Sequence, residues 1–404
     1  MSQQNILQPR ADRLQLLPSQ ELDLRLGKVT EVMRSQGIDA LLVNDNVNLF
    51  YLTGRVFCGY VLIVSDGSVA YFVRRPVHLS GDDIHYIRKP EEMSDIIGKM
   101  APVGATVGLM CDDTSYSFIE RLAKMLPEGM KSRNGSGILR EARAVKTPLE
   151  LSMMEASGAL QTDVYKKVPG LYMEGMSDIE LQVEIERALR LKGCLGIFRT
   201  SGDELELFMG NVLTGENADS PSPYDFAMGG RGMDPSLPVG ADGTLIRRSC
   251  PVMVDMNGNF NGYMTDMTRC YIAGPVPEEV AKAHRLSCDI CRAVADAARP
   301  GVATKDLYEL ALRMATEAGL ADCFMGHRQH AGFVGHGIGI TVNEPPVLAP
   351  RSKDILKAGH TIAVEPKFVI PGYGAIGIEN SYVICEDGPA RCITLCPEEI
   401  MSLE

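Results

Sequence analysis

Apolar and polar positions along the first third of the chain alternate between two periods. In residues 19–37 the apolar side chains lie three or four positions apart, which predicts an amphipathic helix. The run IDALLV follows as a short buried strand, and the later runs VLIV, VAYFV and TVGLM are also typical of strands. Helical spacing returns at 90–100 and 115–126. This alternation predicts a mixed sheet covered by helices, an α/β domain over residues 1–141.

A second domain is expected over residues 142–404. It opens with two long helical patterns, at 148–167 and 177–192, and the second begins with Ser-Asp-Ile-Glu, a helix-capping sequence. Residues 214–243 are rich in Gly, Pro, Ser and Asp. Such a stretch is too long for a passive connection, so it predicts either a loop over a site or a disordered insertion.

Composition narrows the class of protein. The chain has 404 residues, 45% of them hydrophobic and 23% charged, which is typical of a globular protein. Its net charge of −12 and the lack of a basic run argue against nucleic acid and membrane surfaces as partners. We find no signal peptide and no apolar run of about 18 residues, so we expect a cytoplasmic protein.

The cysteine content also favours a cytoplasmic location. There are 11, an odd number scattered through a chain large enough to build its own core, which favours a reducing environment. Cys288 and Cys291 form a CxxC within a helical pattern. With no second CxxC and no histidine pair nearby, they are interpreted as helix thiols rather than as a zinc or redox site.

Candidate chemistry lies in two hairpin-like segments of the second domain. In PVMVDMNGNFNGYMTDMTRCYIAG, a turn centred near Phe260–Asn261 would place Asp255 directly opposite Asp266. In TIAVEPKFVIPGYGAIGIENSYVIC, a turn centred on Gly372 would place Glu365 opposite Glu379. A bulge would shift either register by one residue.

Carboxylates paired in this way repel one another unless a cation lies between them. His336 stands among four glycines in GFVGHGIGI, where a neutral imidazole can point inward as a ligand. Four carboxylates and one imidazole match two divalent ions, whose four positive charges balance the protein's four negative ones. At a separation of about 3.5–4 Å two such ions would share a bridging water and lower its pKa.

These residues also carry a family resemblance. The five candidate ligands, in the settings VDMNGNFNGYMTDMTR, GHGIGI, VEP and IENSY, resemble the superfamily of aminopeptidase P, prolidase, methionine aminopeptidase and creatinase. LREARAVKTPLELSMMEASG at 139–158 resembles the entry to the catalytic domain of the prolidase-like branch. The resemblance implies a creatinase-like N-terminal domain followed by a pita-bread catalytic domain.

The resemblance implies a hydrolase with two divalent ions, manganese, cobalt, zinc or iron, that cleaves near the N-terminus of a peptide or a proline-containing dipeptide. Asp255 would hold one ion and His336 the other, with Asp266 and Glu379 bridging them. Glu365 would bind a metal and act as the general base. Relatives commonly associate through the N-terminal domain, which implies a homodimer.

Several positions depart from the peptidase pattern. Family peptidases typically have histidines four residues before and seven residues after the ligand histidine, where this chain has Gly332 and Asn343. A further histidine upstream of the first Asp has no counterpart between His85 and His284, and the Arg of the prolidase branch is replaced by Gly377. Asn343 can still donate a hydrogen bond to a carbonyl but cannot carry a proton.

The departures leave three functions open. The first is an Xaa-Pro peptidase; the second is a metal-dependent lyase or amidohydrolase acting on a small non-peptide zwitterion; the third is a binding module with a vestigial site. His330 is the nearest substitute for the missing histidines and a candidate catalytic residue, together with Glu365 and Asn343. Weaker candidates to line the pocket are His327, Tyr224 and Arg231.

Overall fold

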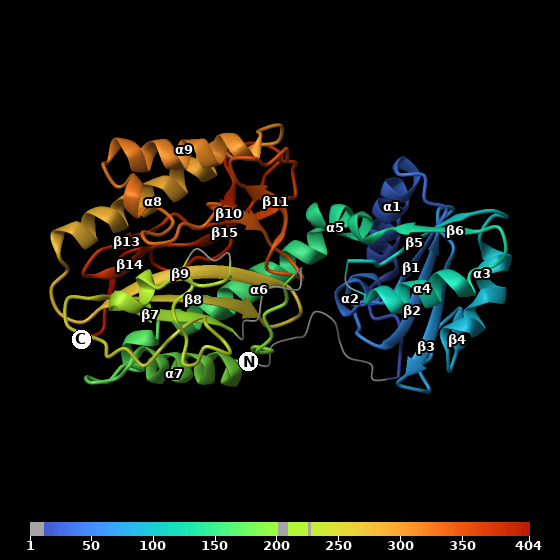
Figure 1. Cartoon of the computed structure of the whole chain (residues 1–404), viewed down its shortest axis with the longest axis horizontal. Coiled ribbons are helices and arrows are strands. Elements are labelled where there is room, and N and C mark those ends of the chain that lie inside the picture. The colour runs from blue at the N-terminus through green and yellow to red at the C-terminus, as the bar shows by residue number, and fades with distance from the viewer. Residues whose placement is uncertain (1–11, 113, 201–208, 225–227) are drawn as a thin grey trace. The chain divides into compact units, whose positions relative to one another are not determined.

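The protein forms two compact units, Met1–Arg143 and Ala144–Glu404 (Figure 1). The computed structural model describes residues 12–112, 114–200, 209–224 and 228–404. Within these ranges no helix is long and apolar enough to cross a membrane.

The first unit is built on a mixed sheet with the strand order β4-β3-β2-β1-β5-β6. β1 pairs antiparallel with β2 and parallel with β5, as a sheet of α/β units allows. Its strands are β1 Ala40–Val43, β2 Cys58–Val64, β3 Val69–Arg75, β4 Ile84–Tyr86, β5 Thr106–Leu109 and β6 Lys131–Asn134. The predicted strands are therefore confirmed.

Helices cover both faces of this sheet because successive strand residues point to opposite sides. Ala40 and Leu42 pack with residues of the helices on one face, whereas Leu41 and Val43 are buried on the other. The helices are α1 Ser19–Ser35, α2 Asn46–Thr53, η1 Pro90–Met93, α3 Ser94–Met100, α4 Tyr116–Met125 and α5 Ser136–Ala144. α1, α3 and α4 lie where the helical spacing predicts them.

The second unit opens with α6, Pro148–Tyr165, and α7, Asp178–Leu191. Both begin with a capping box. The hydroxyl of the N-cap Ser or Thr accepts a hydrogen bond from the backbone N–H of the third helical residue. That third residue is a glutamate, and its side chain accepts a hydrogen bond from the backbone N–H of the N-cap residue. The remaining helices of this unit are η2 Val168–Gly170, η3 Gly215–Asp219, α8 Glu278–Ala297, α9 Thr304–Glu317 and η4 Ala321–Cys323.

Three sheets lie between the helix pairs of the second unit (Figure 1). Their strand orders are β17-β9-β8-β7, β11-β10-β12-β15-β16 and β13-β14. The strands are β7 Gly210–Thr214, β8 Pro251–Asn259, β9 Met264–Ile272, β10 Gly335–Gly337, β11 Glu344–Leu348, β12 Thr361–Val364, β13 Lys367–Ile370, β14 Gly374–Gly377, β15 Asn380–Val383, β16 Arg391–Cys392 and β17 Met401–Ser402. In Figure 1, α8 and α9 lie on one side of these sheets, and α6 and α7 on the other.

Candidate metal centre

The hairpin of β8 and β9 carries the two aspartates, but not in the predicted register. Asp255 pairs with Thr268 and Asp266 with Asn257, so the direct pairing of the two acids is wrong by two residues. A two-residue slip keeps both side chains on the same face, where they are diagonal neighbours. The hairpin therefore still brings both aspartates to one surface.

The slip is set at the turn, where hairpin residues bond one another and helix α6. Its last ladder pair is Asn259 with Met264, which leaves a four-residue loop. The Asn259 side chain accepts a hydrogen bond from the Gly262 N–H, and the Asn261 side chain accepts from the Tyr263 N–H while donating to the Met153 carbonyl on α6. Asparagine side chains thus replace strand pairs and lengthen the turn.

The second acidic hairpin has the predicted register. Lys367 pairs with Gly377 on one side of the two glutamates, and Val364 pairs with Asn380 on the other. Both ladders place Glu365 opposite Glu379, and Gly372 sits at the turn with φ +83°, a left-handed conformation that favours glycine. The prediction of a turn centred on Gly372 is confirmed.

His336 lies in the middle of β10, between β11 and β12. The glycines on either side of it are required by the close approach of other backbone. A Cβ at Gly335 would lie 2.4 Å from the Ala363 carbonyl oxygen, and one at Gly337 would lie 2.3 Å from that of Pro345. The His336 Nδ1–H donates to the Gly337 carbonyl at 3.1 Å, which leaves Nε2 available as a ligand.

The five predicted ligands converge. His336 Nε2 lies 3.4 Å from Glu365 Oε1 and 3.9 Å from Glu379 Oε1. Their ligand atoms form two groups, each within 4.8 Å: Asp266, His336 and Glu379 in one, and Asp255, Glu365 and Glu379 in the other. Nitrogen and carboxylate oxygen are the donors that Mn, Co, Fe and Zn accept. Among the described residues Glu379 Oε1 is buried without a hydrogen-bond partner, so the first group fits a cation.

One member of the centre was missed by the sequence analysis. The Lys367 ammonium contacts Asp255 Oδ2 at 2.7 Å, Glu365 Oε2 at 2.7 Å and Glu379 Oε2 at 3.2 Å. The sequence spacing could have predicted this position. Lys367 is two residues after Glu365, and side chains at i and i+2 of an extended segment share a face. It also faces Gly377, the position where the prolidase branch commonly has an arginine.

The cluster shifts the pKa values of its members. Burial raises the pKa of Asp266 to about 7, helped by the nearby Asp255 charge, and burial together with the charges of Asp266 and Glu365 raises that of Glu379 well above its usual range. Burial opposes ionisation of Glu365 too, but the Lys367 charge and His336 lower its pKa to about 2. Burial alone would lower the pKa of Lys367, whereas the three carboxylates hold it well above the ordinary lysine value. Lys367 and Glu365 are therefore a charged pair.

Neighbouring residues fix the orientation of the ligands. The Thr268 hydroxyl donates to Glu379 Oε2 at 2.9 Å. The Ser381 hydroxyl donates to the Asp266 carbonyl and accepts from the Asp266 N–H, both at 2.9 Å, which joins β9 to β15. Arg269 is fully buried and donates to the Glu379 carbonyl and to the Asn380 side chain. Thr268, Ser381 and Arg269 were not expected from the sequence to support the site.

The centre is nearly sealed. The side chains of Glu365, Glu379 and Lys367 are 5%, 1% and 0% exposed, whereas Asp255 and His336 retain 17% and 13%. Among these five side chains, Asp255 and His336 therefore contribute most of the surface that the cluster exposes to solvent.

The other candidate residues lie outside the cluster. His330 is exposed, with Nδ1 hydrogen-bonded to the Phe324 carbonyl, and Asn343 is exposed just before β11. Catalytic roles for these two residues therefore stay predictions.

The 214–243 segment, described except for 225–227, packs on the loop that carries His327. His327 Nδ1 lies 2.9 Å from Asp219, and Tyr224 lines the same small pocket as His327. Arg231 is exposed and pairs with Asp242.

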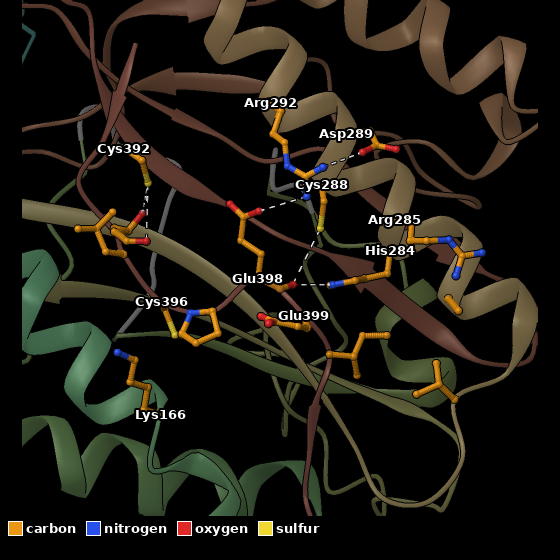
Figure 2. A pocket seen from close by; sticks show the side chains of 16 residues that line it. Lys166, His284, Arg285, Cys288, Asp289, Arg292, Cys392, Cys396, Glu398 and Glu399 are labelled. Atoms are coloured by element: carbon orange, nitrogen blue, oxygen red, sulfur yellow. Dashed lines mark hydrogen bonds and ion pairs between the residues drawn. The ribbon is translucent and has the colours of Figure 1, made fainter. Parts of the chain in front are cut away.

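A groove of about 1020 Å³ lies along α8 and the segment after β16 (Figure 2). It is lined by His284, Cys288 and Arg292 of the helix, and by Glu398 of the later segment, but by none of the five predicted ligands. Cys288 and Cys291 are both buried on α8. Burial raises the pKa of the Cys288 thiol to about 11 and raises that of Cys291 well above the usual thiol value. These cysteines are therefore helix thiols held in the protonated form.

A carboxylate and histidine centre between a helix-covered set of sheets defines a class, the pita-bread metallohydrolases. Residues 152–386 match metallopeptidase family M24, and residues 25–145 match the creatinase/prolidase N-terminal domain. The chain belongs to metallopeptidase family M24. The sequence resemblance and the fold class inferred from it are confirmed.

Individual relatives agree with this assignment. The Xaa-Pro dipeptidase of Pyrococcus horikoshii is 22% identical over 374 residues, 91% of this chain and 96% of that protein. A probable dipeptidase, PepE, of Mycobacterium tuberculosis is 28% identical over 265 residues, 65% of this chain and 62% of PepE.

Solved structures share the fold. The Pyrococcus horikoshii prolidase gives a TM-score of 0.75 at 21% identity, over 93% of this chain and 99% of that one. An Xaa-Pro dipeptidase from Bacillus anthracis gives 0.77 at 20% identity, over 94% and 99%.

Proposed function

We propose that the protein is a metal-dependent peptidase that cleaves short peptides with proline in the second position. One observation carries the proposal: Glu365, Glu379 and Asp266 converge on His336 Nε2, leaving a buried oxygen of Glu379 without a partner. The names of the relatives, Xaa-Pro dipeptidases that align over nearly their whole length, support proline-containing peptides as the substrate class.

The chain's own residues suit hydrolysis. A divalent ion held by Asp266, His336 and Glu379 would polarise the scissile carbonyl and lower the pKa of a nearby water. Hydrolysis adds the water oxygen to the carbonyl carbon, breaks the C–N bond and moves one proton to the leaving nitrogen. Glu365 carries that proton on Oε1, because its other oxygen is held by Lys367 and Oε1 faces His336.

Four finer expectations belong to this proposal. The expected metal is manganese, cobalt, zinc or iron, and the family resemblance implies two ions per chain. The homodimer rests on the family resemblance and is tested by light scattering of the purified protein. A cytoplasmic location is supported by the eleven free cysteines, which suit a reducing compartment.

The proposal is tested with chelator-stripped protein reloaded separately with Mn²⁺, Co²⁺, Zn²⁺ or Fe²⁺. We expect proline release from Xaa-Pro dipeptides that requires the ion, and little release from the matching Xaa-Ala dipeptides. Tripeptides in the same assay separate a dipeptidase from an aminopeptidase. His336→Ala, which removes the only nitrogen ligand, serves as the inactive control.

The second candidate function is a lyase or amidohydrolase acting on a small zwitterion. It is favoured by Gly332 and Asn343, which stand where family peptidases have histidines, and by the exposure of His330. Bound metal without cleavage of any peptide would overturn the peptidase proposal and favour this candidate. Absence of bound metal after reloading would favour the binding module.

A further inference from the structure

The Lys367 ammonium lies at the centre of one of the two ligand groups. Its three N–H bonds meet three carboxylates, those of Asp255, Glu365 and Glu379, at 2.7, 2.7 and 3.2 Å. These are the same three residues whose oxygens lie within 4.8 Å of one another and could hold a metal. The side chain thus occupies the position between them with a cation of its own.

A divalent ion and this ammonium cannot share the position. Metal–oxygen bonds of about 2.0–2.2 Å would place an ion among the same oxygens that the ammonium contacts. Nζ would then overlap the ion or have to leave the cluster.

The residues around Lys367 hold its ammonium among the three carboxylates. The side chain is fully buried, and its backbone is fixed in β13 by pairing with Gly377 and by the hydrogen bond from the Met325 N–H to its carbonyl. The next residues along the strand, Phe368 and Val369, belong to the hydrophobic core. A displaced ammonium would be buried without a partner, which is strongly unfavourable.

The other ligand group is left open by the lysine. Lys367 contacts Oε2 of Glu365 and Oε2 of Glu379, whereas the Oε1 atoms of both face His336 Nε2. Glu379 Oε1 has no hydrogen-bond partner among the described residues. One cation position is therefore filled by the chain itself, and one remains.

We propose that Lys367 replaces one of the two metal ions, so that each chain binds a single divalent ion at Asp266, His336 and Glu379. The proposal rests on the proposed function only in taking this group as the metal site. It predicts an enzyme whose second cation is permanent and does not exchange.

Metal stoichiometry tests the proposal without an activity assay. Chelator-stripped protein is dialysed to equilibrium against excess Mn²⁺, and the ions bound per chain are counted by elemental analysis. We expect one ion in the wild-type protein and two in Lys367→Ala, where the three carboxylates are released. Lys146→Ala is the matched control: Lys146 is equally buried and pairs with Glu344 at 2.8 Å, so the count stays at one.

Thermal unfolding provides a second measurement on the same samples. In chelator, Lys367→Ala should melt below the wild type, because its carboxylates repel one another, and excess Mn²⁺ should raise its Tm more than that of the wild type. Two ions in the wild type, or one in a folded Lys367→Ala, would overturn the proposal. If the variant does not fold, the wild-type count decides by itself.

The two proposals fail separately. One ion without peptide cleavage would leave the lysine assignment standing and remove the peptidase. Two ions with cleavage would do the reverse, and a wild-type protein that binds no ion would overturn both.

Discussion

At the scale of single residues, the centre depends on glutamates that divide their two oxygens between different cation positions. Glu365 and Glu379 each direct Oε2 to Lys367 and Oε1 toward His336. Thr268 adds a hydrogen bond to Glu379 Oε2, which fixes the rotamer of that carboxylate. Replacing either glutamate would therefore disturb both positions at once, whereas Asp266 belongs to the His336 group alone.

Asp266→Asn isolates the open metal position. The amide keeps the shape of the side chain but removes the negative charge, so we expect Mn²⁺ affinity to fall by roughly 100-fold or more, since even outer-shell partners of ligands are worth 10–100-fold. Isothermal titration with Mn²⁺ measures this. Asp289→Asn on the exposed face of α8 makes the same chemical change away from the site and should bind Mn²⁺ like the wild type. An unchanged affinity in Asp266→Asn would remove Asp266 from the ligand set.

His284, on the buried face of α8, should make the free energy of unfolding depend on pH. Burial lowers the pKa of this histidine, whose Nε2 bonds the Glu398 carbonyl at 2.7 Å (Figure 2). The unfolded chain binds a proton more readily, so the neutral histidine's contribution is complete above the unfolded pKa of about 6.5 and is lost as the pH falls through the folded value.

Urea unfolding of chelator-treated protein at pH 7 and pH 5 tests this effect. The free energy of unfolding should fall more steeply in the wild type than in His284→Gln, by up to about 1.4 kcal/mol per pH unit. The difference between the two proteins cancels the titration of the metal ligands. Parallel pH profiles for wild type and His284→Gln would contradict the expectation.

At the scale of elements, the predicted ligands lie within strands or directly beside a strand end, and neighbouring strands fix their positions. β10 can lie close to β11 and β12 only because glycines flank His336. β9 is tied to β15 by the two hydrogen bonds of Ser381, so Asp266 and Glu379 stay in contact. Arg269 then links β9 to the backbone of Glu379 and to the chain beyond residue 393, through the carbonyls of Thr394, Cys396 and Pro397.

Gly335→Ala tests the close packing of β10. The new Cβ would lie 2.4 Å from the Ala363 carbonyl, so the strands must separate and His336 must move. We expect a loss of about 1–3 kcal/mol in the free energy of unfolding and weaker Mn²⁺ binding. Gly170→Ala is the control, since a Cβ there meets nothing within 4 Å, and should change stability by less than about 0.5 kcal/mol. Wild-type stability and Mn²⁺ binding in Gly335→Ala would refute the packing argument.

At the scale of the whole molecule, the predicted metal site belongs to one of the two units. Every predicted metal ligand lies in the unit Ala144–Glu404, and the other unit carries its own sheet and core. A ligand that binds one folded unit stabilises that unit by mass action and leaves an independent unit unchanged.

Calorimetry with and without Mn²⁺ tests this division. At a free concentration 100 times Kd, the ion should stabilise the metal-binding unit by about 2.7 kcal/mol. We expect one of two thermal transitions to move upward and the other to stay in place. Asp266→Asn should abolish the shift. A shift of both transitions together would mean that the units unfold as one.

The register of one hairpin in the site could be predicted from the sequence, and that of the other could not. In the second hairpin the turn is a local Pro-Gly unit, and the register follows from it. In the first, Asn261 bonds the carbonyl of Met153, a residue 108 positions away, and the loop is longer than the local pattern indicates. A register that depends on a distant helix cannot be obtained from the hairpin's own residues.

The sequence by itself determined the elements, the two-part fold class, the five residues that converge and the family, because periodicity, capping and ligand motifs are properties of neighbouring positions. Only the tertiary structure decided which of these residues contact one another. The slip of the first hairpin, the tie from β9 to β15 and the place of Lys367 among three carboxylates depend on strands from separate parts of the chain. Their packing divides the acids into two groups, one that surrounds the Lys367 ammonium and one that surrounds His336 Nε2.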